Sequence, residues 1–462
     1  MKKLNKIYIG ALSAVLILAA CNKQLDLKPH NSIEQSEAIL TAQDVQSTLV
    51  GAYNRMGLSD FYGGGAFLYP DMMATQDYVS WHGTYQQITD MSNQAILVDN
   101  SFVQATWLDG FQVINQTNNV LANLSKVAAG DKDRTEGEAK FIRGMVYFEM
   151  ARLFGKDWND GDPASNLGVP IVLTPTVALT PAAFVVRESV AKNYEQAIAD
   201  LTDAEAKMPE DNSYYADKYA AAAILARLYL QQGNYAKAAA EATVVIGSGK
   251  FQLNTNYAAE FPNPGKKSPV HVDNTTEDIF AIQVTDQQGV NSLNTYYASK
   301  TYGGRGDIHV NEDFIGDFED GDTRAALFQY DDPTDNTTTF RCRKFDNLDG
   351  NVHVIRLAEI YLIRAEANLR LGASTGDSPL NDVNIVRSRA QISPLLAVTI
   401  DDVLLERKHE LAFEGGFFMY DAKRLQQQIG GLPFNSDKLV FPIPKQDINA
   451  NPKLVQNPGY GN

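Results

Sequence analysis

The chain has little cysteine and fewer basic than acidic residues, and both shortages exclude classes of protein. Two cysteines among 462 residues cannot form a disulfide framework. The chain has 40 Lys and Arg residues and 56 Asp and Glu residues, which gives a formal net charge of −16. A chain this acidic repels phosphates, so we expect no nucleic-acid partner. Hydrophobic residues still make up 44% of the chain, which excludes disorder for most of it because this much apolar surface can build a core.

Long apolar runs are missing except at the amino terminus. Lys2, Lys3 and Lys6 precede a nearly continuous apolar run over residues 7–20. This length is typical of the hydrophobic region of a signal peptide and is too short to span a bilayer as a stable helix. We therefore expect residues 1–20 to be a signal peptide and the rest of the chain to have no spanning segment.

The end of this run points to a lipid anchor. It reads Leu18-Ala19-Ala20-Cys21, and small residues before a cysteine resemble the lipobox of bacterial lipoproteins. The alternative is an ordinary signal peptide with an incidental cysteine. We expect residues 1–20 to be removed as a lipoprotein signal, Cys21 to carry the lipid, and residues 21–30 to form a lipidated tether.

The rest of the chain is patterned mainly as helices. Apolar residues recur every three or four positions across 187–208, which predicts an amphipathic helix. Residues 139–154, 219–230 and 357–371 are apolar on more than one side, which predicts helices buried among other helices.

Residues 223–246 predict a helical hairpin. One helix ends at Gly233, Asn234-Tyr235 makes the turn, and an alanine-rich helix returns. This hairpin resembles a tetratricopeptide unit, and residues 357–390 are a second candidate. No strict period repeats along the chain, so we expect no regular solenoid.

Two stretches, near 60–102 and near 261–344, lack helical patterning and are rich in glycine and polar residues. Long irregular stretches of this kind in compact proteins are usually functional. We expect residues 31–462 to form a single, mainly α domain, a frame of tetratricopeptide-like helical hairpins that carries these two stretches as loop-rich insertions.

Aromatic residues gather in both insertions. Flat rings match the apolar faces of sugars, and neighbouring polar groups can hold the hydroxyls. Packing in the core is the alternative for each ring. The candidate ligand-binding residues are Tyr78, Trp81 and Tyr85 in the first insertion and Tyr296, Tyr297, Tyr302 and Arg305 in the second.

Acidic residues recur at helical spacing in one segment, as Glu406, Glu410 and Glu414. Paired carboxylates are the catalytic groups of glycoside hydrolases. The interpretation that we favour is an ion-pair network in which Arg407 pairs with Glu410, because three carboxylates on one helix repel each other unless cations lie between them. We expect no catalytic residues.

Metal ligands do not stand out from their spacing. The six histidines include no His-x-x-x-His pair, and Cys342 has no cysteine partner. We therefore expect neither a metal site nor a cofactor.

Several segments, taken in order, resemble the SusD/RagB family of outer-membrane lipoproteins of the Bacteroidota. They include Glu138-Ala-Lys-Phe-Ile-Arg-Gly-Met-Val-Tyr-Phe148 and Leu404-Leu-Glu-Arg-Lys-His-Glu-Leu-Ala-Phe-Glu-Gly415. The other matching segments are 25–29, 357–367, 380–390, 421–424, 441–444 and 457–460.

The resemblance implies a SusD-like fold and a nutrient-binding function. Such a protein would be lipid-anchored in the outer membrane and face the cell exterior. It would capture an oligosaccharide without catalysis and act as the lid of a SusC-like, TonB-dependent barrel transporter. A peptide-binding member of the same family is the alternative, and a lipid-anchored glycoside hydrolase or a protein-recruiting scaffold are further ones.

Overall fold

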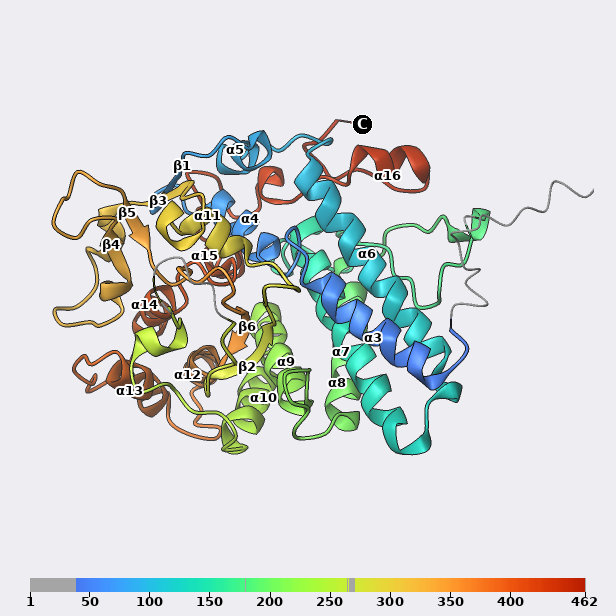
Figure 1. Ribbon diagram of the computed structural model, residues 1–462, viewed down its shortest axis with the longest axis horizontal. Helices are drawn as coiled ribbons and strands as arrows, with labels where there is room; N and C mark the ends of the chain where they lie inside the picture. Colours follow the sequence, from blue (N-terminus) through green and yellow to red (C-terminus); the bar gives the residue numbers. More distant parts are fainter. Residues whose placement is uncertain (1–38, 179, 264, 266–270, 462) are drawn as a thin grey trace, which may run out of the picture.

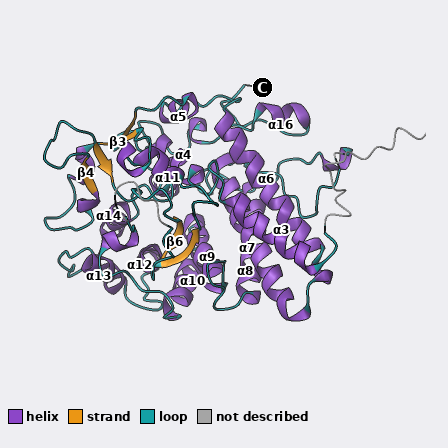
Figure 2. Cartoon of the chain, viewed as in Figure 1, coloured by secondary structure: helices purple, strands orange, loops and turns teal. Residues whose placement is uncertain are grey.

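The computed structural model describes residues 39–178, 180–263, 265 and 271–461. The expected signal peptide, the tether and Cys21 lie outside the described residues. Within them the chain is mainly helical, with three small sheets (Figures 1 and 2), so the expected fold class is confirmed. No helix in this described part combines the length and the apolar character that crossing a bilayer requires.

The helices form two groups that meet along the middle of the molecule (Figure 1). Helix α7 packs between α6 and α8, and α3 packs on α6; α10 packs on both α9 and α12, and α12 in turn contacts α13 and α14. The bounds are α3 Ala42–Met56, α4 Gly65–Ala74, α5 Gln86–Ser92, α6 Ser101–Ala122, α7 Ala129–Phe154, α8 Val190–Lys207, α9 Lys218–Gln232, α10 Tyr235–Gly247, α11 Ser292–Tyr297, α12 Leu357–Leu371, α13 Pro379–Arg389, α14 Ile400–Glu410, α15 Phe417–Arg424 and α16 Lys445–Ala450.

The predicted hairpins are present. Helix α9 begins after Asp217, whose side chain accepts hydrogen bonds from the first backbone N–H groups, and ends at Gly233 with a φ of 74°. A left-handed residue of this kind stops a helix, and glycine adopts it without a steric penalty. Gly372 ends α12 in the same way, before Pro379 opens α13. The alanine-rich sequence of the first hairpin lets α9 and α10 approach each other closely.

The first insertion contains more helix than we expected. Residues 60–102 include α4 and α5, and nearly all of α4 is buried. The glycines at 63–65 suggested a loop, but the apolar residues that follow them form a core helix. The first insertion therefore combines buried helix with loops.

The three sheets each pair two antiparallel strands, and one of them joins the two insertions. Strand β1 comes from the first insertion and β3 from the second, with Val79 opposite Val310 and Trp81 opposite Ile308. The strands are β1 Val79–Trp81, β2 Asp278–Ile282, β3 Ile308–Val310, β4 Phe328–Tyr330, β5 Phe340–Cys342 and β6 Val352–Arg356. The pairs β2–β6 and β4–β5 lie within or beside the second insertion.

A buried ion-pair network holds Glu406 and Glu410 of α14 and Glu414, which follows this helix. Glu410 contacts Arg356 at 2.6 Å and also pairs with Arg389 and Arg324, and Glu414 contacts Arg356 at 2.7 Å. Burial alone would raise the pKa of Glu410, but the three guanidinium groups hold it well below its usual range. The ion-pair interpretation is confirmed.

The expected partner within this network was wrong. Arg407 pairs with Asp421 of α15, with N–O distances of 3.1 and 3.2 Å, rather than with Glu410. The guanidinium of Arg407 turns toward α15, while Glu410 faces the arginines of other segments. Spacing along one helix shows which residues are neighbours, but not which other helices they face.

Candidate functional site

The pairing of β1 with β3 brings aromatic residues of both insertions together. The rings of Trp81 and Tyr296 are 5.8 Å apart in an edge-to-face arrangement, and those of Tyr85 and Tyr296 are 6.2 Å apart. The guanidinium carbon of Arg305 lies 4.8 Å from the centre of the Tyr85 ring. We call Trp81, Tyr85, Tyr296 and Arg305 the aromatic cluster.

Hydrogen bonds hold two members of the aromatic cluster, Trp81 and Arg305, in place. The indole N–H of Trp81 donates to the hydroxyl of Thr89 at 3.0 Å. Arg305 donates to Asp307 at 2.6 Å and to the hydroxyl of Thr84 at 3.3 Å. Groups held in one orientation lose little entropy when a ligand binds, so this arrangement is suited to recognition.

Exposure differs across the aromatic cluster. Tyr85 is 38% exposed, Trp81 is half-buried and Tyr296 is only 8% exposed. A side chain at Gly83 would meet the indole, because an added Cβ would lie 2.2 Å from a ring carbon of Trp81. The loop therefore lies directly on the indole, and Tyr85 and Arg305 form the most open part.

Two polar groups of the aromatic cluster, those of Tyr296 and Arg305, keep constant charge near neutral pH. Burial, with the nearby Tyr85, raises the pKa of Tyr296 to about 12, so its hydroxyl stays protonated. The hydrogen bond to Asp307 raises the pKa of Arg305. A ligand would therefore meet a neutral phenol and a fixed guanidinium.

A hollow of about 520 Å³ adjoins the aromatic cluster. Arg305 lines this hollow and also contacts Tyr85, so the two features share this residue. Tyr302 lies in its wall with the guanidinium carbon of Arg343 4.7 Å from the ring centre. The other residues that line the hollow are Ser299, Lys300, Thr301, Gln329, Asp331, Pro333 and Arg341.

Tyr297 belongs to the core, which corrects its place among the candidates. Its side chain has no exposed surface, and its ring lies 5.2 Å from that of Phe345 and 5.6 Å from that of Phe413. Successive residues of a helix point about 100° apart, so Tyr296 reaches the aromatic cluster while Tyr297 points inward. A ligand at the surface does not reach it.

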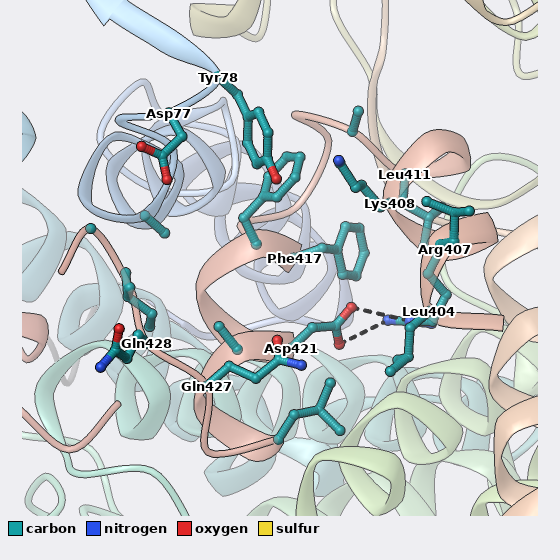
Figure 3. A pocket seen from close by; sticks show the side chains of 18 of the residues that line it. Asp77, Tyr78, Leu404, Arg407, Lys408, Leu411, Phe417, Asp421, Gln427 and Gln428 are labelled. Atoms are coloured by element: carbon teal, nitrogen blue, oxygen red, sulfur yellow. Dashed lines mark hydrogen bonds and ion pairs between the residues drawn. The ribbon is translucent and has the colours of Figure 1, made fainter. Parts of the chain in front are cut away.

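Tyr78 lies apart from the aromatic cluster, beside a cavity of about 370 Å³ between α14 and α15. Its ring is 5.4 Å from that of Phe418, and the ammonium of Lys408 lies 4.5 Å from the ring centre. Figure 3 shows Tyr78, Lys408 and Phe417 around this cavity, with Asp421 joined to Arg407. Sequence reasoning assigned the α14 residues to ion pairing and did not predict that they line a cavity.

Comparisons with known proteins agree with this architecture. A family model described as starch-binding associating with outer membrane matches residues 23–230, and the model of the SusD family matches residues 334–432. The chain belongs to the SusD/RagB family.

Individual SusD-like relatives match all or part of the chain. SusD-like protein P38 of Formosa agariphila is 22% identical, and the alignment covers all of both chains. The starch-binding protein SusD of Bacteroides thetaiotaomicron is 33% identical over 24% of this chain and 22% of its own. A solved structure of a putative sugar binding protein from Bacteroides vulgatus has a TM-score of 0.79 at 26% identity, over 92% of this chain and all of the other.

Proposed function

We propose that this SusD-like protein binds an oligosaccharide at the cell surface and does not cleave it. The observation that carries the proposal is the aromatic cluster, to which both insertions contribute and which shares Arg305 with the neighbouring hollow. The family description, starch-binding associating with outer membrane, and the sugar-binding name of a structural relative support the same ligand class.

In this proposal, capture depends on rings and fixed polar groups. Tyr85 and the exposed part of Trp81 contact the apolar faces of a sugar. Arg305 donates to its hydroxyls, and Lys300 and Asp331 extend polar contacts along the hollow. Specificity then comes from the insertions, while the helical frame holds them.

The burial and ion pairing of the acidic residues in and just after α14 support binding without catalysis. Glycoside hydrolysis needs two carboxyl groups that flank the scissile bond. Glu406, Glu410 and Glu414 are buried and held by arginines or lysine. They do not reach a glycan in the aromatic cluster.

We further propose the remaining features that the family resemblance implies. Residues 31–462 form one domain, and the continuous core between Ile39 and Leu454 supports this. The lipid on Cys21 and the tether 21–30 hold that domain to the outer membrane, facing outward. There it acts as the lid of a SusC-like, TonB-dependent barrel, and ligand contacts favour the closed state.

The test is a glycan array followed by calorimetry with the glycans that bind. Trp81→Ala should weaken binding by about 2 kcal/mol, or about thirtyfold, as for a central aromatic anchor. Tyr214→Ala is the matched control, because Tyr214 is an exposed ring whose aromatic contact is with Tyr215, outside the aromatic cluster.

Three results would contradict the proposal. Equal affinities for wild type and Trp81→Ala would show that the aromatic cluster is not the binding surface. Cleavage products that appear on long incubation and disappear with a Glu or Asp substitution would identify a hydrolase. Binding of peptides but of no glycan would identify the peptide-binding alternative.

A further inference from the structure

Three side chains from separate segments converge at the base of the second insertion. They are Glu260 at the end of the short 3-10 helix Tyr257–Glu260, Asp278 at the start of β2 and His353 in β6. One carboxylate oxygen of each acid and one ring nitrogen of the histidine all lie within 4.8 Å of one another. The last two lie on strands that pair antiparallel with each other.

Each carboxylate is held from outside through one oxygen, and its other oxygen faces this centre. Oε2 of Glu260 accepts hydrogen bonds from the Asn254 amide and the Thr275 hydroxyl, both at 2.6 Å. Oδ2 of Asp278 accepts from the backbone N–H of Thr275 at 2.8 Å. Fixing of ligand groups by outer hydrogen bonds is characteristic of metal sites.

The inward oxygen of Glu260 has no donor in the described part of the chain. Glu260 is fully buried, and its Oε1 accepts no hydrogen bond there, although Nδ1 of His353 lies 3.4 Å away. The same Nδ1 lies 2.5 Å from Oδ1 of Asp278. Burying a carboxylate oxygen without a donor costs free energy, and a bound cation would remove that cost.

We propose that Glu260, Asp278 and His353 bind a divalent transition-metal ion of the zinc class. In a tetrahedral zinc site with bonds of about 2.0–2.1 Å, neighbouring ligand atoms are about 3.3 Å apart. The distance from His353 to Glu260 already matches, and that from His353 to Asp278 would lengthen by about 0.8 Å. Calcium fits poorly, because it takes six to eight oxygen ligands and no imidazole.

Space for a fourth ligand lies next to the site. A cavity of about 20 Å³ is lined by Asp278, His353 and Thr275, and this volume holds one water molecule. The ion would tie the segment that ends at Glu260 to the β2–β6 sheet. This function is independent of glycan binding at the aromatic cluster.

The experiment uses purified protein stripped with a chelator, then supplied with zinc chloride and desalted. We expect one zinc per chain by elemental analysis and a melting temperature that rises by a few degrees with zinc. Glu260→Gln keeps the size of the side chain but removes its charge, and should weaken zinc affinity at least about tenfold. Glu195→Gln on the exposed side of α8 is the matched control and should bind like wild type.

Cobalt(II) provides a second readout, since a four-coordinate site gives intense visible absorption that Glu260→Gln should lose. If Glu260→Gln does not fold, His353→Gln is compared in the same way. The proposal is wrong if desalted protein holds no zinc, if the variant binds zinc as wild type does, or if calcium stabilises the protein and zinc does not.

Discussion

Replacing Arg143 by methionine should destabilise the protein strongly, because it leaves a buried aspartate without its cation. Arg143 on α7 donates to both oxygens of Asp200 on α8, at 2.7 and 2.8 Å, and to the Asn118 side chain at 2.8 Å. The side chains of the ion pair are only 7% and 4% exposed. Asp200 forms no other ion pair within the described part of the chain.

The expected loss of unfolding free energy is about 3–5 kcal/mol, the range found when one partner of a buried ion pair is removed. Protonating an ordinary aspartic acid at pH 7 costs about 4 kcal/mol, so proton uptake by the stranded carboxyl limits the penalty to a similar size. The lost hydrogen bond to Asn118 adds about 1 kcal/mol.

Urea unfolding measures the effect, with variants Arg143→Met, Asp200→Asn and the double substitution. The double variant should be more stable than the sum of the two single losses predicts, since it leaves neither charge unpaired. Lys192→Met is the matched control, because Lys192 forms a surface pair with Glu188 and its loss should change stability by less than about 0.5 kcal/mol.

This reasoning is refuted if Arg143→Met costs no more than the surface control. Strict additivity of the two single substitutions would also contradict it. Either result would mean that water or another group reaches Asp200 readily.

Two further predictions concern acid stability and helix packing. Although burial alone would raise the pKa of Glu366, its ion pair with Arg424, at 2.6 and 2.7 Å, holds that pKa below the usual value. Glu366→Gln should therefore reduce stability most at neutral pH. The difference from wild type should shrink as the pH falls below about 4.3, because the unfolded chain then takes up a proton at this carboxyl while the folded chain, whose pKa is lower, does so only at more acid pH. A pH-independent difference in melting temperature would contradict this. Gly144→Ala should lower the free energy of unfolding in urea by about 1–3 kcal/mol, because an added Cβ on α7 would lie 2.9 Å from Leu201. Gly130→Ala on the same helix is the control: its added Cβ meets nothing within 4 Å, and it should raise the free energy of unfolding by up to about 1 kcal/mol. Equal effects of the two substitutions would show that α7 and α8 are not in close contact.

Much of the helical frame follows from local patterns. The hairpin around Gly233 and the buried helices at 139–154 and 357–371 could be predicted, because apolar spacing and helix-stopping glycines act over a few residues. The apolar helix α4 was missed, since the preceding glycines suggested a loop and its residues show no polar face to mark it.

The candidate site was predicted only in part. Trp81, Tyr85, Tyr296 and Arg305 were named from composition and setting, but their convergence required the β1–β3 pairing between segments more than 200 residues apart. The burial of Tyr297 depends on the rotation of one short helix.

The sequence by itself determined the mainly α class, the ends of the helices that stop at Gly233 and Gly372, and the ion-pair character of the acidic residues from Glu406 to Glu414, because these depend on spacings within one segment. Only the tertiary structure decided which distant groups meet. In it, Arg407 pairs with Asp421 and Tyr78 lies apart from the aromatic cluster. Glu260, Asp278 and His353 lie together around one centre. Contacts between remote segments depend on the packing of the whole core, and no local spacing records them.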